Sequence, residues 1–338
     1  MKVTIPEELK KDVPQTGWGK IFNATPVVMA VVATMLAGLA SSEMTRAQYD
    51  RSLAAQQQSK AGDQWSFFQA KRLRGAYQRN TADLLQTIVS VRQLDAAAFR
   101  TAAEQLPGDP SGSGAQLKND LLAWLASPGG QQAMPLLQKG ELPSRNEAAV
   151  TDPTIKAALD AAENLRPDAE LAGLLAPITA ASLETAIHAA RDQALAFDAV
   201  TRPVNQAVDL LESLLTRQAA LQAKADSTAV QAATSAPSLN RDFTAARLRY
   251  AAQRYEVEAR LNQVIANLYE LQVRKSNISA ERHHARSQRF FFGMLGAQLA
   301  VIISTFAIAA RQRNLLWGLA AAAGLLAIAF AIYVYLRV

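Results

Sequence analysis

The sequence contains no cysteine, which excludes disulfides, thiolate metal sites and cysteine nucleophiles together. Aromatic residues are also scarce, at 7% of the chain, and the Val-, Ile-, Thr- and Tyr-rich runs that strands favour are few. Hydrophobic residues nevertheless make up 50% of the chain, and alanine, the strongest helix former, supplies many of them. The composition therefore predicts an all-α protein.

Recognisable catalytic apparatus is absent as well. The sequence has no glycine-rich phosphate loop, no GxSxG and no HExxH. His283 and His284 are adjacent, so a helix would point them about 100° apart and away from any shared metal; we expect them at a membrane edge beside Arg282. Glu256 and Glu258 would lie on different helix faces as solvated charges. We expect a protein that is not an enzyme and uses no metal or cofactor.

The chain is basic, with a formal net charge of +6 and a pI near 9.6. Lys and Arg cluster near hydrophobic segments and along long helices, and no compact patch of basic and aromatic residues stands out. This distribution favours positioning in a lipid bilayer over binding of nucleic acid.

Two uncharged hydrophobic segments at the C-terminal end, residues 290–310 and 315–336, are long enough to be transmembrane helices. A third candidate, residues 21–40, is weaker because Asn23, Thr25 and Pro26 lie in its first turns. It could instead be a cleaved signal peptide, since Gly38-Leu39-Ala40 resembles a small-x-small cleavage site. We favour a retained helix and hence three spans.

Orientation follows from the short basic segments. The N-terminal tail, residues 1–20, contains four lysines, and the link at 311–313 contains two arginines. The positive-inside rule places both in the cytoplasm and the middle of the chain outside, as in a multi-pass protein of a bacterial inner membrane. Arg282, Arg286 and Arg289, on the outer side in this topology, argue the other way.

The middle of the chain is expected to contain two long helices, residues 41–100 and 241–289, that flank an alanine-rich helical insertion at 101–240. Apolar residues on one face of the first helix include Leu73, Tyr77, Leu84 and Ile88. The second helix has a heptad-like seam, which predicts an antiparallel coiled-coil-like stalk; an ordinary amphipathic helix on a globular body is the alternative, because Arg247, Arg254 and Lys275 interrupt the stripe. The seam residues are Phe243, Tyr250, Val257, Leu261, Val264, Leu268, Leu271 and Ile278.

The short segment with the most distinctive composition is AGDQWSFFQAKRLR at residues 61–74, where three large aromatic residues share about one turn. Either several helices enclose them, or they form an exposed contact for a partner or a second copy. The candidate contact residues are Asp63, Trp65, Phe67, Phe68, Gln69 and Lys71.

Residues 62–71, GDQWSFFQAK, resemble the signature of a bacterial membrane-protein family catalogued as domain of unknown function 4337. The resemblance covers about residues 20–95 and 240–338, and the insertion is larger than in a typical member. It implies membrane residence and three spans, and it brings no activity and no catalytic residue.

The sequence thus predicts a membrane-anchored helical scaffold or spacer of unknown process, with the lipid bilayer and a second copy or another membrane protein as partners and no nucleic acid or known small molecule. Two other functions remain open. The chain could be an accessory subunit of a transporter or envelope complex, or a membrane sensor whose helical head binds a ligand.

Overall fold

The computed structural model describes residues 17–104, 113–140, 142, 150, 152–226, 236–309 and 313–337. These residues form nine α-helices and no strand, in agreement with the all-α expectation. Most of the expected N-terminal tail and most of the 311–313 link lie outside the described residues. The chain divides into two compact units, unit 1 at residues 1–56 and 273–338 and unit 2 at residues 57–272.

Two very long helices contribute to both units. Helix α2 runs from Gly17 to Ile88, and α9 runs from Ala236 to Ala309. Helix α2 passes through Gly38-Leu39-Ala40 without interruption, so the small residues of the candidate cleavage site are ordinary helix positions. Alanine-rich composition and the absence of an interior proline after Pro26 allow such length.

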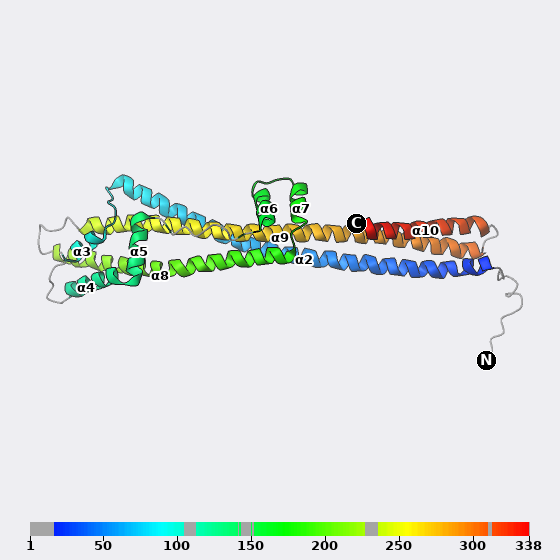
Figure 1. Ribbon diagram of the computed structural model, residues 1–338, viewed down its shortest axis with the longest axis horizontal. Coiled ribbons are helices and arrows are strands. Elements are labelled where there is room, and N and C mark those ends of the chain that lie inside the picture. The colour runs from blue at the N-terminus through cyan, green and yellow to red at the C-terminus, as the bar shows by residue number, and fades with distance from the viewer. Residues whose placement is uncertain are drawn as a thin grey trace, which may run out of the picture. The chain divides into compact units, whose positions relative to one another are not determined.

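Unit 1 contains the start of α2, the end of α9 and all of α10, Arg313–Arg337 (Figure 1). Small side chains fill its interior, among them Ala33, Ala297 and Ala300, whereas large apolar residues such as Val27 and Phe306 are exposed. Apolar residues on the outside and small residues between helices are typical of a bundle in lipid.

Helices α2, α9 and α10 each contain a stretch long and apolar enough to cross a membrane; a fourth is counted if α7 and α8, which meet at 89°, are taken together. The spans expected at 21–40, 290–310 and 315–336 fall on these three helices. Glycines let the helices of unit 1 approach closely. A Cβ built on Gly293 would lie 3.4 Å from Leu36 Cδ1 and 3.9 Å from the Ala327 carbonyl oxygen.

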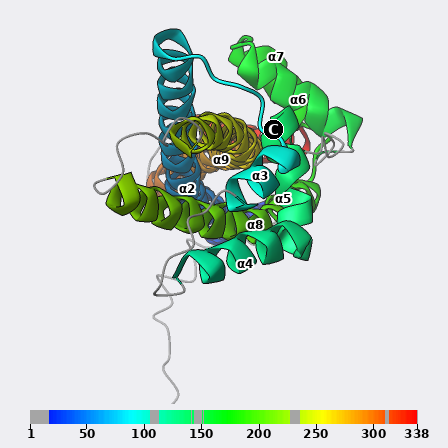
Figure 2. The same cartoon turned by 90° about the vertical axis from the view of Figure 1, so that its left-hand side faces the viewer.

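The core of unit 2 lies where three short helices pack on α8, Ala180–Asp226, and on the beginning of α9 (Figure 2). The short helices are α3, Ala96–Glu104, α4, Ser113–Ala126, and α5, Pro128–Lys139. Trp124 anchors this core, because its ring is buried and its Nε1 donates to the Ala207 carbonyl oxygen at 2.7 Å. Ser127 ends α4 and caps α5, accepting a hydrogen bond from the Gly130 amide, in agreement with the turn that the sequence Ser127-Pro128-Gly129-Gly130 predicts.

Helices α6, Pro153–Glu163, and α7, Asp168–Leu175, form a separate short pair (Figure 1). Asp152 caps α6 and Pro153 occupies its first turn, the arrangement that the sequence Thr151-Asp152-Pro153 predicts for a helix start. Asn267 on α9 donates to Glu163 Oε1 at 2.6 Å and so ties α6 to that helix.

The first stalk helix ends earlier than expected, because α2 stops at Ile88 and residues 96–104 form the separate α3. Two aspartates account for the break. Asp242 accepts a hydrogen bond from the Arg92 amide at 3.0 Å, and Asp95 accepts one from the Ala97 amide, which caps α3. The segments 107–114, rich in proline and glycine, and 227–238, small and polar, are both predicted by the sequence to be loops and lie largely outside the described residues.

Candidate functional site

The aromatic motif lies on the part of α2 that pairs with α9 in unit 2. Trp65 is half-buried, and its Nε1 donates to Glu270 Oε1 at 2.6 Å. Phe68 meets Trp65 edge-on, with ring centroids 5.3 Å apart and an interplanar angle of 83°. This geometry favours aromatic pairs, because the positive edge of one ring meets the negative face of the other.

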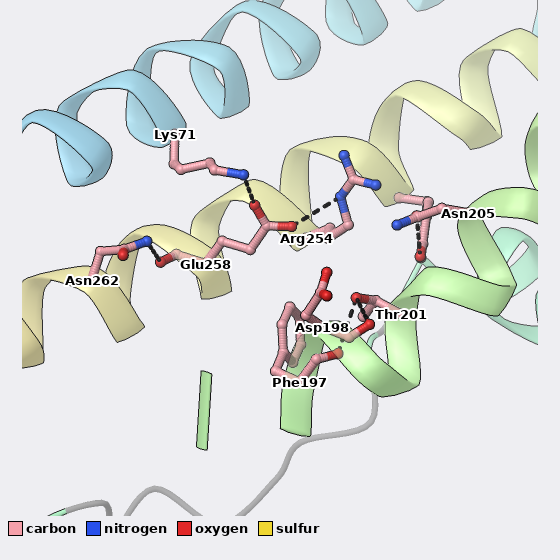
Figure 3. A network of polar contacts seen from close by, with 9 residues as sticks. Lys71, Phe197, Asp198, Thr201, Asn205, Arg254, Glu258 and Asn262 are labelled. Carbon is pink, nitrogen blue, oxygen red and sulfur yellow. Dashed lines mark hydrogen bonds and ion pairs between the residues drawn. The ribbon is translucent and has the colours of Figure 1, made fainter. Parts of the chain in front are cut away.

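Two helical turns closer to the end of α2, Lys71 forms an ion pair with Glu258. Figure 3 shows the same carboxylate also reached by Arg254, whose Nε lies 3.3 Å from Glu258 Oε1. The Tyr255 ring lies beside both cations, 5.4 Å from Lys71 Nζ and 4.6 Å from the Arg254 guanidinium carbon. Cation–π attraction therefore adds to the ion pairs at this point of the α2–α9 contact.

A second ion pair continues the contact. Arg79 on α2 approaches Glu256 on α9 at 2.5 Å, and Arg260 approaches the same carboxylate at 2.8 Å. The hydrogen bond from Arg79, with a smaller contribution from Arg260, lowers the pKa of Glu256 below its usual value. Residue numbers rise along α2 as they fall along α9 through these contacts, so the two helices are antiparallel.

The backbones come together at Gly75. A Cβ built on this glycine would lie 3.4 Å from both the Ala252 carbonyl oxygen and Tyr255 Cβ. Buried small residues recur every seven positions on α9, at Ala245, Ala252, Ala259 and Ala266. Helix α2 has buried small residues in the same register at Ala61, Gly75 and Ala82, with the half-buried Phe68 between the first two. We call this set the small-residue seam.

The structure brings together only some of the candidate contact residues. Trp65, Phe68 and Lys71 face the α9 side, through the contacts described above or by partial burial. Asp63, Gln69 and Phe67 are exposed. The motif therefore combines a face that joins α9 with a face that remains at the surface.

The residues of the predicted stalk seam also differ in how deeply they are buried. Phe243, Tyr250, Leu268 and Leu271 are buried, while Val257, Leu261, Val264 and Ile278 are half-buried. Phe243 and Tyr250 belong to the core that α9 shares with α3, α4, α5 and α8, so they do not line a simple two-helix stalk. The Tyr250 hydroxyl donates to Asn205 Oδ1 at 2.9 Å on α8, and burial raises the pKa of Tyr250 to about 12.

Glu258 is not the solvated charge that the sequence suggested. Its side chain is 20% exposed and pairs with both Lys71 and Arg254. Glu256 is more exposed but is also paired. Local sequence does not predict these partners, because they lie far apart along the chain, 187 residues for Lys71 and Glu258. The seven-residue recurrence of alanine on α9 is a signal that the sequence itself contains.

In unit 1 the two adjacent histidines have different partners. His283 Nδ1 lies 2.5 Å from Glu43 Oε2, and His284 Nε2 lies 3.1 Å from Gln288 Nε2. One turn further along α9, Ser287 Oγ donates to the Ala40 carbonyl oxygen at 2.7 Å. The bonds of His283 and Ser287 join α2 and α9 within unit 1, whereas that of His284 lies within α9. No group of three or more His, Asp or Glu side chains in the described part of the chain could hold a metal ion.

The fold and these contacts define an all-α protein in which three helices are apolar enough to cross a membrane and two of them also pair through polar and small residues. Residues 19–107 match the model of a family described as Domain of unknown function (DUF4337). The family expected from the motif is thereby confirmed for this segment, whereas the resemblance expected at 240–338 lies outside the match. No curated protein and no solved structure gave a significant match.

Proposed function

We propose that this protein is a membrane-anchored helical scaffold that performs no chemistry and acts through helix–helix assembly. The observation that carries the proposal is the α2–α9 contact of unit 2. The strongest polar groups there, on Trp65, Lys71, Glu258 and Glu270, bind one another rather than converging on an open cavity. Such groups specify which helices pair and in which register, which is what a scaffold requires.

The architecture of the contact supports this role further. The close approach of the two helices at Gly75 packs their backbones together, and the flanking ion pairs oppose a shift of one helix along the other. A shift by one turn would separate Lys71 from Glu258 and Arg79 from Glu256 at the same time. Rigid, register-specific helices are suited to holding partners at defined positions.

In this proposal α2, α9 and α10 cross a bacterial inner membrane, with the N-terminal tail in the cytoplasm and unit 2 on the outer side. The lysines of residues 1–20 and the arginines of 311–313 support the orientation. Retention of the first span is supported by the hydrogen bond from Ser287 to the Ala40 carbonyl oxygen, because cleavage after Ala40 would remove the α2 side of the unit 1 contact.

The proposal is tested on the full chain in its membrane. We expect alkaline carbonate to leave the protein in the membrane fraction, reporters placed at 107–114 to lie outside and reporters placed after Arg313 to lie in the cytoplasm. Native electrophoresis after mild solubilisation should show an assembly larger than the 36.4 kDa chain. A protein that washes off the membrane, or one that is monomeric with no bound protein, would contradict a scaffold; a cytoplasmic unit 2 would overturn the orientation alone.

A further inference from the structure

A stripe of large apolar side chains runs along the outer face of α2 in unit 2. The outer stripe consists of Leu73, Tyr77, Leu84 and Ile88, which are 72%, 69%, 60% and 69% exposed. Their spacings of four, seven and four residues place them on one helix face. Gly75 and Ala82, on the opposite face, are buried, so α2 uses its small residues against α9 and leaves its largest apolar ones uncovered.

Lipid does not account for this exposure. Apolar residues such as Val27 and Phe306 are exposed on the long uncharged stretches of unit 1, where acyl chains would cover them. The turns of α2 that carry the outer stripe also carry Arg72, Arg74 and Arg79. Three arginines within about two turns are costly in hydrocarbon, so these turns lie in water, where a contiguous apolar stripe marks a site of protein association.

We propose that the outer stripe is the surface through which two copies of this chain associate, with their α2 helices parallel; this inference rests on the proposed scaffold function and names its partner. Residues on the stripe face of α2 meet their own counterparts in a symmetric parallel pair, so any charge there would meet a like charge. Within residues 66–88 the centre of that face carries none: besides the four apolar residues it has Ser66, Ala70 and Asn80, whereas Arg74 lies at its edge.

The spacing and the anchoring both suit a second copy. Apolar residues four and seven apart are the repeat by which side chains of parallel helices interdigitate. Copies inserted in one membrane point the same way and are confined to one plane, which raises their effective concentration and selects parallel over antiparallel pairing. An unrelated partner would need no uncharged face, because it could offer complementary charges.

The absence of cysteine makes the test direct. Single variants Tyr77→Cys and Leu84→Cys of the full chain, oxidised in native membranes, should each form a disulfide-linked dimer. Phe67→Cys is the matched control, because Phe67 is also large, apolar and 54% exposed but lies about a quarter turn around α2 from the outer stripe. We expect at least a tenfold higher dimer yield at residues 77 and 84 than at 67. Leu84→Glu should abolish the Tyr77→Cys cross-link while leaving the helical content unchanged.

The outcomes separate this inference from the proposed function. Equal yields at the three positions would show random collision and overturn the stripe as an interface. Cross-links that form only between a Leu73→Cys chain and an Ile88→Cys chain would overturn the parallel arrangement. A large native assembly that Leu84→Glu leaves intact would overturn the inference but retain the scaffold. A chain that is monomeric in every assay and holds no other protein would overturn both.

Discussion

Trp65 Nε1 donates a hydrogen bond to Glu270 Oε1 at 2.6 Å, joining two residues that lie 205 positions apart in the chain. The bond connects the most distinctive residue of the family motif to the other long helix. Because the acceptor is a carboxylate, the bond is stronger than one between neutral groups. It gives the motif a structural task, which is to fix how α2 lies on α9.

Replacing Trp65 by Phe tests this task. The variant keeps an aromatic ring beside Phe68 but removes the donor, so we expect the free energy of unfolding to fall by about 1–2 kcal/mol. Trp65→Ala, which also removes the ring packing, should cost more and loosen assembly. Chemical denaturation in detergent measures both, and Phe67→Leu at the exposed neighbour is the control. The assigned task is wrong if Trp65→Phe and Phe67→Leu lose equal stability.

The two glycines of the motif region predict opposite responses to the same substitution. A Cβ on Gly75 would touch Ala252 and Tyr255 at 3.4 Å, whereas a Cβ on Gly62 would have nothing within 4 Å. Leucine at position 75 should therefore push α2 from α9 and cost about 1–3 kcal/mol. Leucine at position 62 should raise stability by up to about 1 kcal/mol, because it favours the helix over glycine. The thermal unfolding midpoints of the two variants test this prediction. Equal shifts of the midpoint would contradict close packing at Gly75.

Unit 1 offers the same comparison for its helices. Gly293 faces Leu36 and Ala327, and Gly318 has nothing within 4 Å of its Cβ position. Gly293→Leu should lower the thermal stability of the protein in detergent, since overpacking costs about 1–3 kcal/mol. Gly318→Leu should not. A bundle that tolerates both substitutions would not be packed as described.

The buried hydroxyl of Tyr250 predicts a dependence of stability on alkaline pH. Its pKa is raised by burial from 10.0 to about 12, so between these values the unfolded chain loses this proton and the folded chain keeps it. The contribution of this pKa difference to the free energy of unfolding is fully present below pH 10 and is lost as pH rises toward 12. Tyr250→Phe should remove that part of the slope and also cost about 1 kcal/mol at neutral pH, because Asn205 loses a donor.

Denaturant midpoints measured from pH 9 to pH 12 test this, and Tyr49→Phe, at an exposed tyrosine outside the outer stripe, is the control for deleting one hydroxyl. Identical pH profiles for wild type and Tyr250→Phe would contradict a buried, hydrogen-bonded Tyr250.

The sequence allowed the helical class, the three apolar segments and the family to be predicted, because each depends on local composition, on the length of an uncharged run or on a short motif. The pairing of α2 with α9 was expected, but its chemistry was not. Large apolar residues on one face of a helix predict where it packs, and yet Leu73 and Tyr77 are exposed while Ala61 and Ala266 are buried. Close helix contacts favour small residues, and alanine is too common in this chain for its heptads to stand out.

The polar partners of Lys71 and Trp65 could not be predicted from the sequence for a different reason. Glu258 and Glu270 are unremarkable in the sequence, and only the register of two helices separated by the whole insertion places them beside Lys71 and Trp65. The early end of α2 at Ile88 likewise depends on Asp242, a residue of another helix that binds the Arg92 amide. Interactions of this kind depend on tertiary structure and leave no local pattern.

The antiparallel pairing of α2 with α9 is the central claim, and one cysteine pair tests it most directly. A Cβ at position 75 would lie 3.4 Å from Tyr255 Cβ, close to the separation of about 3.5–4.5 Å that a disulfide spans. In a chain that is otherwise free of cysteine, Gly75→Cys with Tyr255→Cys should oxidise within one chain, and Gly62→Cys with Tyr255→Cys should not. A bridge that forms only between chains, or equally with position 62, would contradict the pairing on which the scaffold rests.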